Sequence, residues 1–249
     1  MARATGILKI EGTLENITFY KSADGQMVRT KGGVSKKRIK NDPAFVRTRE
    51  NGAEFGHSAN AAKMLRTALG PMAFKAKDRL LFSRLLKVMS QLKNLDTTSA
   101  RGARNVTEGL IDANALQLLR DFDFNTKAGL KTVLLATIAV DTTTGEITTS
   151  EFNPIEQIKY PAGATHFSMQ SAFLNLDFNT GVANISFSPS TSFPLAQGIA
   201  SPVLTPSAVP DGTGTQMFFL LIEFFQEINS VQYSLNNGAY NVLNLVELV

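Results

Sequence analysis

The spacing of apolar residues changes twice along this chain of 249 residues, and that change limits the folds open to it. Residues 6–31 contain short runs rich in β-branched and aromatic side chains, which are typical of β-strands. Residues 42–95 carry helix signals, with apolar side chains at heptad spacing over residues 81–95. From about residue 130 onwards, short strand-like runs again alternate with turn residues. Separate blocks of strand, helix and strand predict an α+β fold.

Residues 1–34 are predicted to form a β-hairpin arm. Two strand-like runs, residues 17–21 and 26–31, flank Asp24-Gly25, a dipeptide that readily adopts the positive φ angles of a tight hairpin turn. A further strand is predicted at residues 7–11, and residues 12–16 have the composition of a turn. Such a small meander is not stable alone. The arm is therefore expected to dock on its own chain or to add strands to a neighbouring copy, and both alternatives stay open.

Residues 35–105 are predicted to form a basic helical region. Asp42 has the side chain of a helix N-cap and Pro43 suits the first helical position, so one helix is expected from there to about Leu69. Gly70-Pro71 ends it, and a second helix is predicted over residues 72–95. Its apolar residues recur at heptad spacing, which favours one buried face: Leu81, Leu85, Val88, Leu92 and Leu95. Two helices joined by so short a turn should pair as an antiparallel hairpin.

Gly52 and Gly56 lie inside the first predicted helix, where each glycine costs about 1 kcal/mol relative to alanine. Close approach of another backbone would offset that cost, and we predict such helix packing at these two residues. The alternative is that the helix breaks near one of them.

Residues 106–249 are predicted to form an acidic, antiparallel β-sandwich domain. About seven short strand-like runs are separated by turn signals, among them Asn236-Asn237-Gly238. The most apolar run, residues 217–225, has the composition of a buried strand although it contains Glu223. A glutamate in that position has to face solvent or find a partner.

Charge is segregated between the two halves of the chain. Residues 1–105 hold 21 of the 25 Lys and Arg and 8 of the 21 Asp and Glu, a net charge of +13. Residues 106–249 carry the remainder, a net charge of −9. This separation favours either contact between the basic half of one copy and the acidic half of the next, or a basic face for nucleic acid. Two solvated surfaces with no partner are the third interpretation.

The densest basic segment, residues 29–49, is the candidate contact region for nucleic acid or for another subunit. Phosphate contact there would be independent of base sequence and sensitive to salt. Phe45 is the one aromatic residue of the segment, although modules that read RNA stack bases on several. A solvated linker, or pairing with the acidic half of a neighbour, is the alternative. The candidate contact residues are Arg29, Lys31, Lys36, Lys37, Arg38, Lys40, Arg47 and Arg49.

The sequence contains no recognisable catalytic or metal-binding pattern. It has no Cys, which excludes disulfides, thiolate chemistry and Cys-based metal sites, and it lacks a glycine-rich phosphate loop and a nucleophile elbow. Its two histidines, His57 and His166, are expected to make structural contacts. Residues 121–125 alternate acidic and aromatic side chains but lack the glycine and glutamate of a calcium loop. We therefore predict no enzyme activity, no cofactor, no metal and no small-molecule substrate.

The N-terminal fifth of the chain resembles a known group of sequences. The resemblance rests on residues 6–21, 31–39 and 41–51, which are GILKIEGTLENITFYK, KGGVSKKRI and NDPAFVRTREN. These blocks are similar to those of an uncharacterised family of bacterial hypothetical proteins. The family has no known activity, so the resemblance implies no site residues.

Together these features predict a non-enzymatic structural subunit that self-associates into a homopolymeric assembly, such as a filament, a tube or a phage-like shell. A sequence-independent nucleic-acid-binding protein is the alternative. A carbohydrate-binding sandwich is a third hypothesis, which the absence of Trp and the presence of four Tyr disfavour. No apolar run reaches the ~20 residues needed to span a bilayer, so no membrane partner is expected. Synthesis in the cytoplasm is predicted, with release as an assembly without a cleaved signal as the alternative.

Overall fold

The computed structural model describes residues 2–3, 10–30 and 32–249, which divide into two compact units. The first unit comprises residues 1–49 and the second residues 50–249. The sequence places boundaries near residues 34 and 105 instead. The difference has a physical cause, because helical residues such as Leu65 and Leu85 lie in the same hydrophobic cluster as Phe219 and Leu243 of the C-terminal strands. Helices and strands of the second unit thus share a core.

The N-terminal unit contains a four-stranded antiparallel sheet of order β1-β4-β3-β2. The predicted hairpin is confirmed, since Ser22 pairs with Gly25 across a tight turn and Gly25 has a φ of +109°. The turn predicted at residues 12–16 is wrong in part, because only its last two residues form a turn. Residues 7–9 of the first predicted strand lie outside the described residues. The strands are β1 (Ala2–Arg3), β2 (Gly12–Leu14), β3 (Ile17–Ser22) and β4 (Gly25–Thr30).

Helical segments follow this sheet: α1 (Lys36–Asn41), the 3-10 turn η1 (Pro43–Phe45) and α2 (Val46–Leu69). Asp42 caps η1 and not the long helix, since its Oδ1 accepts a hydrogen bond from the Ala44 backbone N–H at 2.9 Å. α2 continues through Gly52 and Gly56 without a break, so the alternative of an interruption there is wrong. The predicted end at Leu69 is confirmed.

The second predicted helix is in fact two, α3 (Pro71–Lys75) and α4 (Leu81–Asn94). The single helix over residues 72–95 is wrong because the Asp78 carboxylate accepts a hydrogen bond from the Leu80 backbone N–H at 2.8 Å. Side-chain bonds of this kind compete with helical backbone bonds. The predicted apolar face is confirmed, because its four residues in α4 and Leu95, which caps that helix, are buried or pack against the core.

A seven-stranded antiparallel sheet forms the centre of the second unit, and its path is β10-β8-β12-β14-β5, with β9 also paired to β8 and β13 to β12. Its strands are β5 (Phe122–Asp123), β8 (His166–Leu176), β9 (Ala183–Phe187), β10 (Thr191–Pro194), β12 (Thr215–Ile228), β13 (Val231–Ser234) and β14 (Val242–Leu248). A smaller antiparallel sheet of order β11-β7-β6 contains β6 (Ile138–Val140), β7 (Ile147–Thr149) and β11 (Val203–Leu204). The connecting short helices are α5 (Val106–Gly109), α6 (Ala115–Leu119), α7 (Leu130–Val133), α8 (Pro154–Gln157) and the 3-10 turn η2 (Leu235–Gly238).

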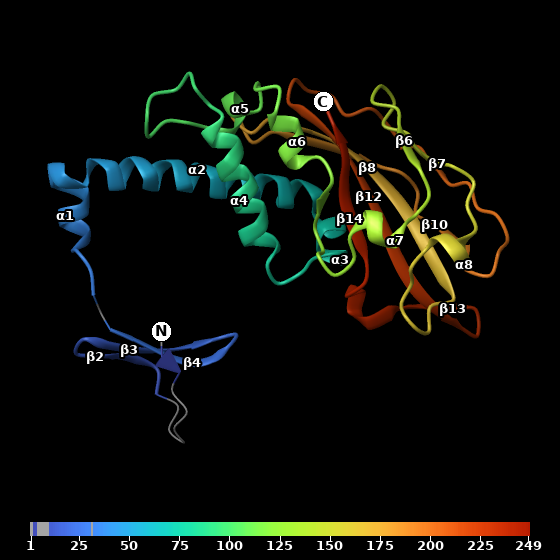
Figure 1. The fold of residues 1–249 in the computed structure, drawn as a ribbon, viewed down its shortest axis with the longest axis horizontal. Coiled ribbons are helices and arrows are strands. Elements are labelled where there is room, and N and C mark those ends of the chain that lie inside the picture. The colour runs from blue at the N-terminus through green and yellow to red at the C-terminus, as the bar shows by residue number, and fades with distance from the viewer. Residues whose placement is uncertain (1, 4–9, 31) are drawn as a thin grey trace. The chain divides into compact units, whose positions relative to one another are not determined.

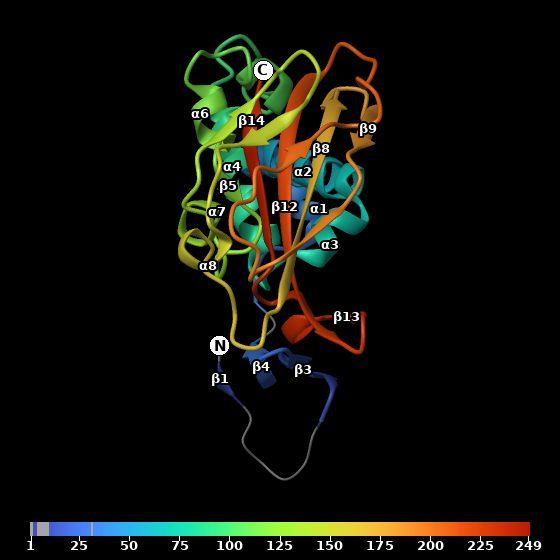
Figure 2. The ribbon, with the colours of Figure 1, turned by 90° about the vertical axis from the view of Figure 1, so that its right-hand side faces the viewer.

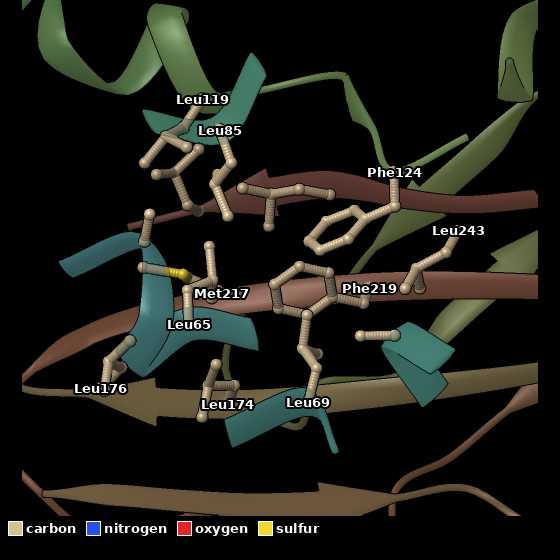
Figure 3. Packing of buried hydrophobic residues seen from close by; sticks show 14 of the residues in the cluster. Leu65, Leu69, Leu85, Leu119, Phe124, Leu174, Leu176, Met217, Phe219 and Leu243 are labelled. Carbon is tan, nitrogen blue, oxygen red and sulfur yellow. The ribbon is translucent and has the colours of Figure 1, made fainter. Parts of the chain in front are cut away.

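The second unit is layered around β12, whose side chains alternate between two hydrophobic clusters. Phe219 and its neighbours at alternate positions face the helices, where Figure 3 shows Phe219 among Leu65, Leu69 and Phe124. Ile222 and its neighbours at alternate positions face the cluster that includes Ile147 of the small sheet. Figures 1 and 2 show α4 on one side of β12 and β14 and the small sheet on the other. The α+β fold with a sandwich-like pair of sheets is therefore confirmed, and a helical layer covers the outer face of the larger sheet.

Candidate interaction surface

One face of the N-terminal sheet carries four apolar side chains, together with Lys21, Gln26 and Thr30. Leu14 pairs with Ile17 and Phe19 pairs with Val28, and paired residues in an antiparallel sheet share a face. Leu14 is 70% exposed and Ile17 is 41% exposed, whereas the other two are half-buried. No described residue between positions 10 and 49 is buried. The four side chains, which we call the arm face, therefore lie over no core formed by the described part of their own unit.

The opposite face of this sheet is more polar. It carries two cross-strand pairs, Thr18 with Arg29 and Tyr20 with Met27. Each of these residues is next in sequence to a residue of the arm face, so its side chain points to the other side of the sheet. The Arg29 guanidinium lies 5.5 Å from the centre of the Tyr20 ring, in a cation–π contact. Arg29 is exposed, so its charge remains available to solvent or to a partner.

Three lysines of the candidate contact segment lie exposed on α1: Lys36, Lys37 and Lys40. Ser35 starts this helix, because its hydroxyl accepts a hydrogen bond from the Arg38 backbone N–H at 3.3 Å. Within the part of the chain that the structure describes, these lysines form no ion pair. α1, which follows the N-terminal sheet in the sequence, therefore carries a cluster of solvated positive charges.

Two of the predicted contact arginines have structural partners instead. Arg38 Nε donates to Asp42 Oδ2 at 3.0 Å. Arg49 Nη1 donates to the carbonyl oxygens of Ile39 at 2.8 Å and of Asp42 at 2.9 Å, and so ties the end of α1 to the start of α2. Arg47 is exposed. Lys31 lies outside the described residues.

The two helix glycines have no neighbour within the described chain. A Cβ atom added at Gly52 or at Gly56 would meet no heavy atom within 4 Å, and both residues are exposed. The close approach predicted for them is therefore not made by any described segment of this chain. Phe55, between them, is 59% exposed, so this side of α2 presents an aromatic ring flanked by bare backbone.

The opposite side of α2 carries a buried glutamate that the sequence does not single out. Glu54 is 2% exposed and accepts hydrogen bonds from Lys93 Nζ at 2.6 Å, from Arg104 Nε at 2.9 Å and Nη2 at 2.8 Å, and from the Gly102 backbone N–H at 2.8 Å. The Arg104 guanidinium, followed by Lys93 and Gly102, lowers the pKa of Glu54 to about 2 against the effect of burial. Both carboxylate oxygens are occupied, so this cluster joins α2, α4 and the following loop.

The Asp96 carboxylate holds the same loop by accepting hydrogen bonds from the backbone of that loop. Burial raises the pKa of this carboxyl, but hydrogen bonds from the backbone N–H groups of Ser99 at 2.9 Å and Asn105 at 3.0 Å, with that of Thr98, outweigh it and keep the pKa below its usual range. Asp96 therefore joins the backbone of residues 98, 99 and 105.

Glu223 and the two histidines also have protein partners. Glu223, whose partner the sequence does not reveal, forms an ion pair with Lys75 Nζ at 2.8 Å. His57 Nε2 accepts from the Val106 backbone N–H at 3.3 Å, and His166 Nε2 lies 3.4 Å from Glu227. Among the described residues, no group of three His, Cys, Asp or Glu side chains could hold a metal ion. These contacts are structural in kind.

No family model, curated protein or solved structure matches the chain. The resemblance of its N-terminal blocks to bacterial hypothetical proteins therefore stays a prediction. In residues 2–3, 10–30 and 32–249, every helix is too short or too polar to cross a membrane. The arm face and the lysines of α1 are the features of the described chain that point most directly to a macromolecular partner.

Proposed function

We propose that this chain is a non-enzymatic structural subunit that associates with copies of itself into a homopolymer. The observation that carries the proposal is the arm face, an apolar surface on a sheet whose unit has no buried residue among those described. A small sheet without a core is marginally stable in water, so a second surface has to cover it. The occupant we propose is the acidic part of a second copy.

Covering the arm face provides a substantial gain. Full burial of a Leu, Ile, Phe or Val side chain yields about 1.5 to 3 kcal/mol. The four side chains are already partly shielded, so docking yields on the order of 4 to 8 kcal/mol before the entropic penalty of association. That gain offsets much of the entropic penalty, and electrostatic attraction between the copies has to supply the remainder.

Charge selects the occupant. Residues 1–49 hold 11 Lys and Arg and 4 Asp and Glu, a net charge of +7, while residues 106–249 carry −9. Contact between unlike surfaces of two identical copies leaves one free surface of each kind at the ends of the pair. Such a heterologous contact forms a ring if the rotation between copies closes and an open filament if it does not. A filament, a tube or a shell is the class of assembly that this geometry favours.

Adjacent substitutions on β2 test the proposal with a matched control. Leu14→Lys places a charge on the arm face, and Thr13→Lys places the same charge on the opposite face of the same strand. Light scattering after size-exclusion chromatography, with negative-stain imaging, should show polymers for wild type and Thr13→Lys. Leu14→Lys should weaken association about tenfold or more, since about 1.4 kcal/mol corresponds to a factor of ten.

Two results would reject self-association. One is a single-chain mass for the wild type at every concentration and at low salt. The other is equal loss of association in both variants. If the wild type is a monomer and Leu14→Lys lowers only its melting temperature, the arm docks on its own chain and the proposal fails.

A second candidate function, sequence-independent nucleic-acid binding, is favoured by the three exposed lysines of α1 without ion-pair partners in the described chain. Three phosphate contacts predict that the logarithm of the binding constant falls with the logarithm of salt at a slope of about −2.7 on duplex DNA. Replacing all three by Gln should remove that slope. Absence of binding to random DNA or RNA in low salt would exclude this function.

A further inference from the structure

Two lysines in the acidic half of the chain lack an acidic partner and line the same cavity. Residues 106–249 contain four basic residues. Arg120 pairs with Glu247, and Lys131 pairs with Asp121 at 2.6 Å. The other two, Lys127 and Lys159, form no ion pair with any residue that the structure describes, and both line a cavity of about 150 Å³.

The cavity is built from segments that backbone hydrogen bonds hold together. The Lys159 backbone N–H donates to the Val133 carbonyl at 2.8 Å, so the segment after α8 lies beside α7. Figure 2 shows α7 and α8 as neighbours. The Asn125 side-chain amide donates to the carbonyls of Ala239 at 3.0 Å and Asn241 at 2.9 Å. That amide holds the Tyr240 loop beside the segment that carries Lys127. The site is therefore assembled from three parts of the chain.

The lining combines positive charge, hydroxyl donors and an apolar wall. Tyr160 and Tyr240, two of the four tyrosines of the chain, are half-exposed at the cavity. Thr132 adds a third hydroxyl, while Ala128, Val133 and Pro161 supply apolar surface, and the lining contains no acidic residue. Two ammonium groups without a counterion favour an anion, and the apolar wall favours a short carbon chain attached to it.

We infer that this cavity binds a small organic carboxylate. Its volume is below the roughly 300 to 1,000 Å³ of sites for drug-sized ligands, which excludes a nucleotide or an oligosaccharide. A larger cleft of about 320 Å³ lies nearby along β14, but it lacks the charge for an anion. Its lysine, Lys131, is bonded to Asp121, and Glu247 adds a second carboxylate. The inference does not depend on self-association.

Tyrosine fluorescence provides a direct assay because the chain has no Trp and half of its tyrosines line the cavity. We would titrate the full-length protein with butyrate and with butyramide, its neutral counterpart of the same shape, at constant ionic strength. Butyrate should change the emission with saturation at millimolar concentration, and butyramide should bind at least about tenfold more weakly.

Lysine variants locate the binding. Lys127→Gln and Lys159→Gln should each weaken butyrate binding several-fold and the double variant at least about tenfold, because the attraction between charges at a partly exposed site is moderate. Lys131→Gln is the matched control from the same region and should bind as wild type does. Circular dichroism should show unchanged melting, since all three lysines are exposed. Absence of saturation, equal binding of butyramide, or equal weakening by Lys131→Gln would overturn the inference.

Discussion

Replacing Glu54 by Gln should destabilise the second unit far more than the loss of an exposed ion pair would. The substitution keeps the shape of the side chain but removes the negative charge that faces Lys93 and Arg104. The Lys93 side chain is 10% exposed, so its ammonium group would lose its counterion in a largely dry environment. Breaking one side of a buried ion pair is among the larger single-residue effects.

The magnitude follows from the pKa of Glu54. A fall from the ordinary value of 4.5 to about 2 corresponds to about 3 kcal/mol of stabilisation of the folded state at neutral pH. The Arg104 side chain is 28% exposed, so solvent screens part of this interaction. We expect a loss of about 2 kcal/mol in the free energy of unfolding.

The same pKa predicts a pH dependence with a defined sign. Because the folded-state pKa is the lower one, the contribution of Glu54 is complete above pH 4.5 and disappears as the pH falls towards about 2. Gln cannot titrate. The difference in unfolding free energy between wild type and Glu54→Gln should therefore shrink by about half or more between about pH 6 and pH 3.

Urea unfolding followed by circular dichroism at both pH values measures this difference. Asp121→Asn is the control, because it removes an ion pair with the same N–O distance of 2.6 Å whose side chains are 77% and 45% exposed. We expect that exposed pair to contribute less than about 1 kcal/mol. Equal effects of the two substitutions, or a difference that does not change with pH, would refute the argument from burial.

Three further predictions test separate parts of the structure. Gly52→Ala should raise the free energy of unfolding, measured with urea, by about 0.5 to 1 kcal/mol. Gly109→Ala should lower it by more than about 1 kcal/mol, because the added Cβ would lie 2.0 Å from the Leu92 carbonyl oxygen. Equal effects of the two substitutions would contradict the packing described for these glycines. Glu223→Gln should cost about 1 kcal/mol or less in the same assay, since Lys75 is 43% exposed and can turn to water. Reversing the charge of the three α1 lysines should abolish association at low salt, as measured by light scattering, and the variant carries Lys36→Glu, Lys37→Glu and Lys40→Glu. An unchanged mass would show that these charges do not drive association.

The candidate surface could be predicted in part. The sequence locates the basic segment and the hairpin, and the structure leaves Arg29 and the α1 lysines exposed as expected. In the structure, Arg38 and Arg49 make contacts inside the N-terminal unit, which the charge of the segment alone could not predict. The arm face could not be predicted from the sequence, because the strand register decides which side chains of neighbouring strands share a face.

The sequence by itself determined the local elements: the Gly25 hairpin, the long helix that ends at Leu69, the apolar face of α4 and the absence of a catalytic pattern. Those features depend on backbone sterics and on periodicity over a few residues. Tertiary structure alone decided which charges meet. Glu54 and Arg104 are 50 residues apart, and Lys75 and Glu223 are 148 apart. Such pairs form because the helices pack their apolar faces on the sheet. A local sequence pattern does not indicate which polar groups this packing brings together.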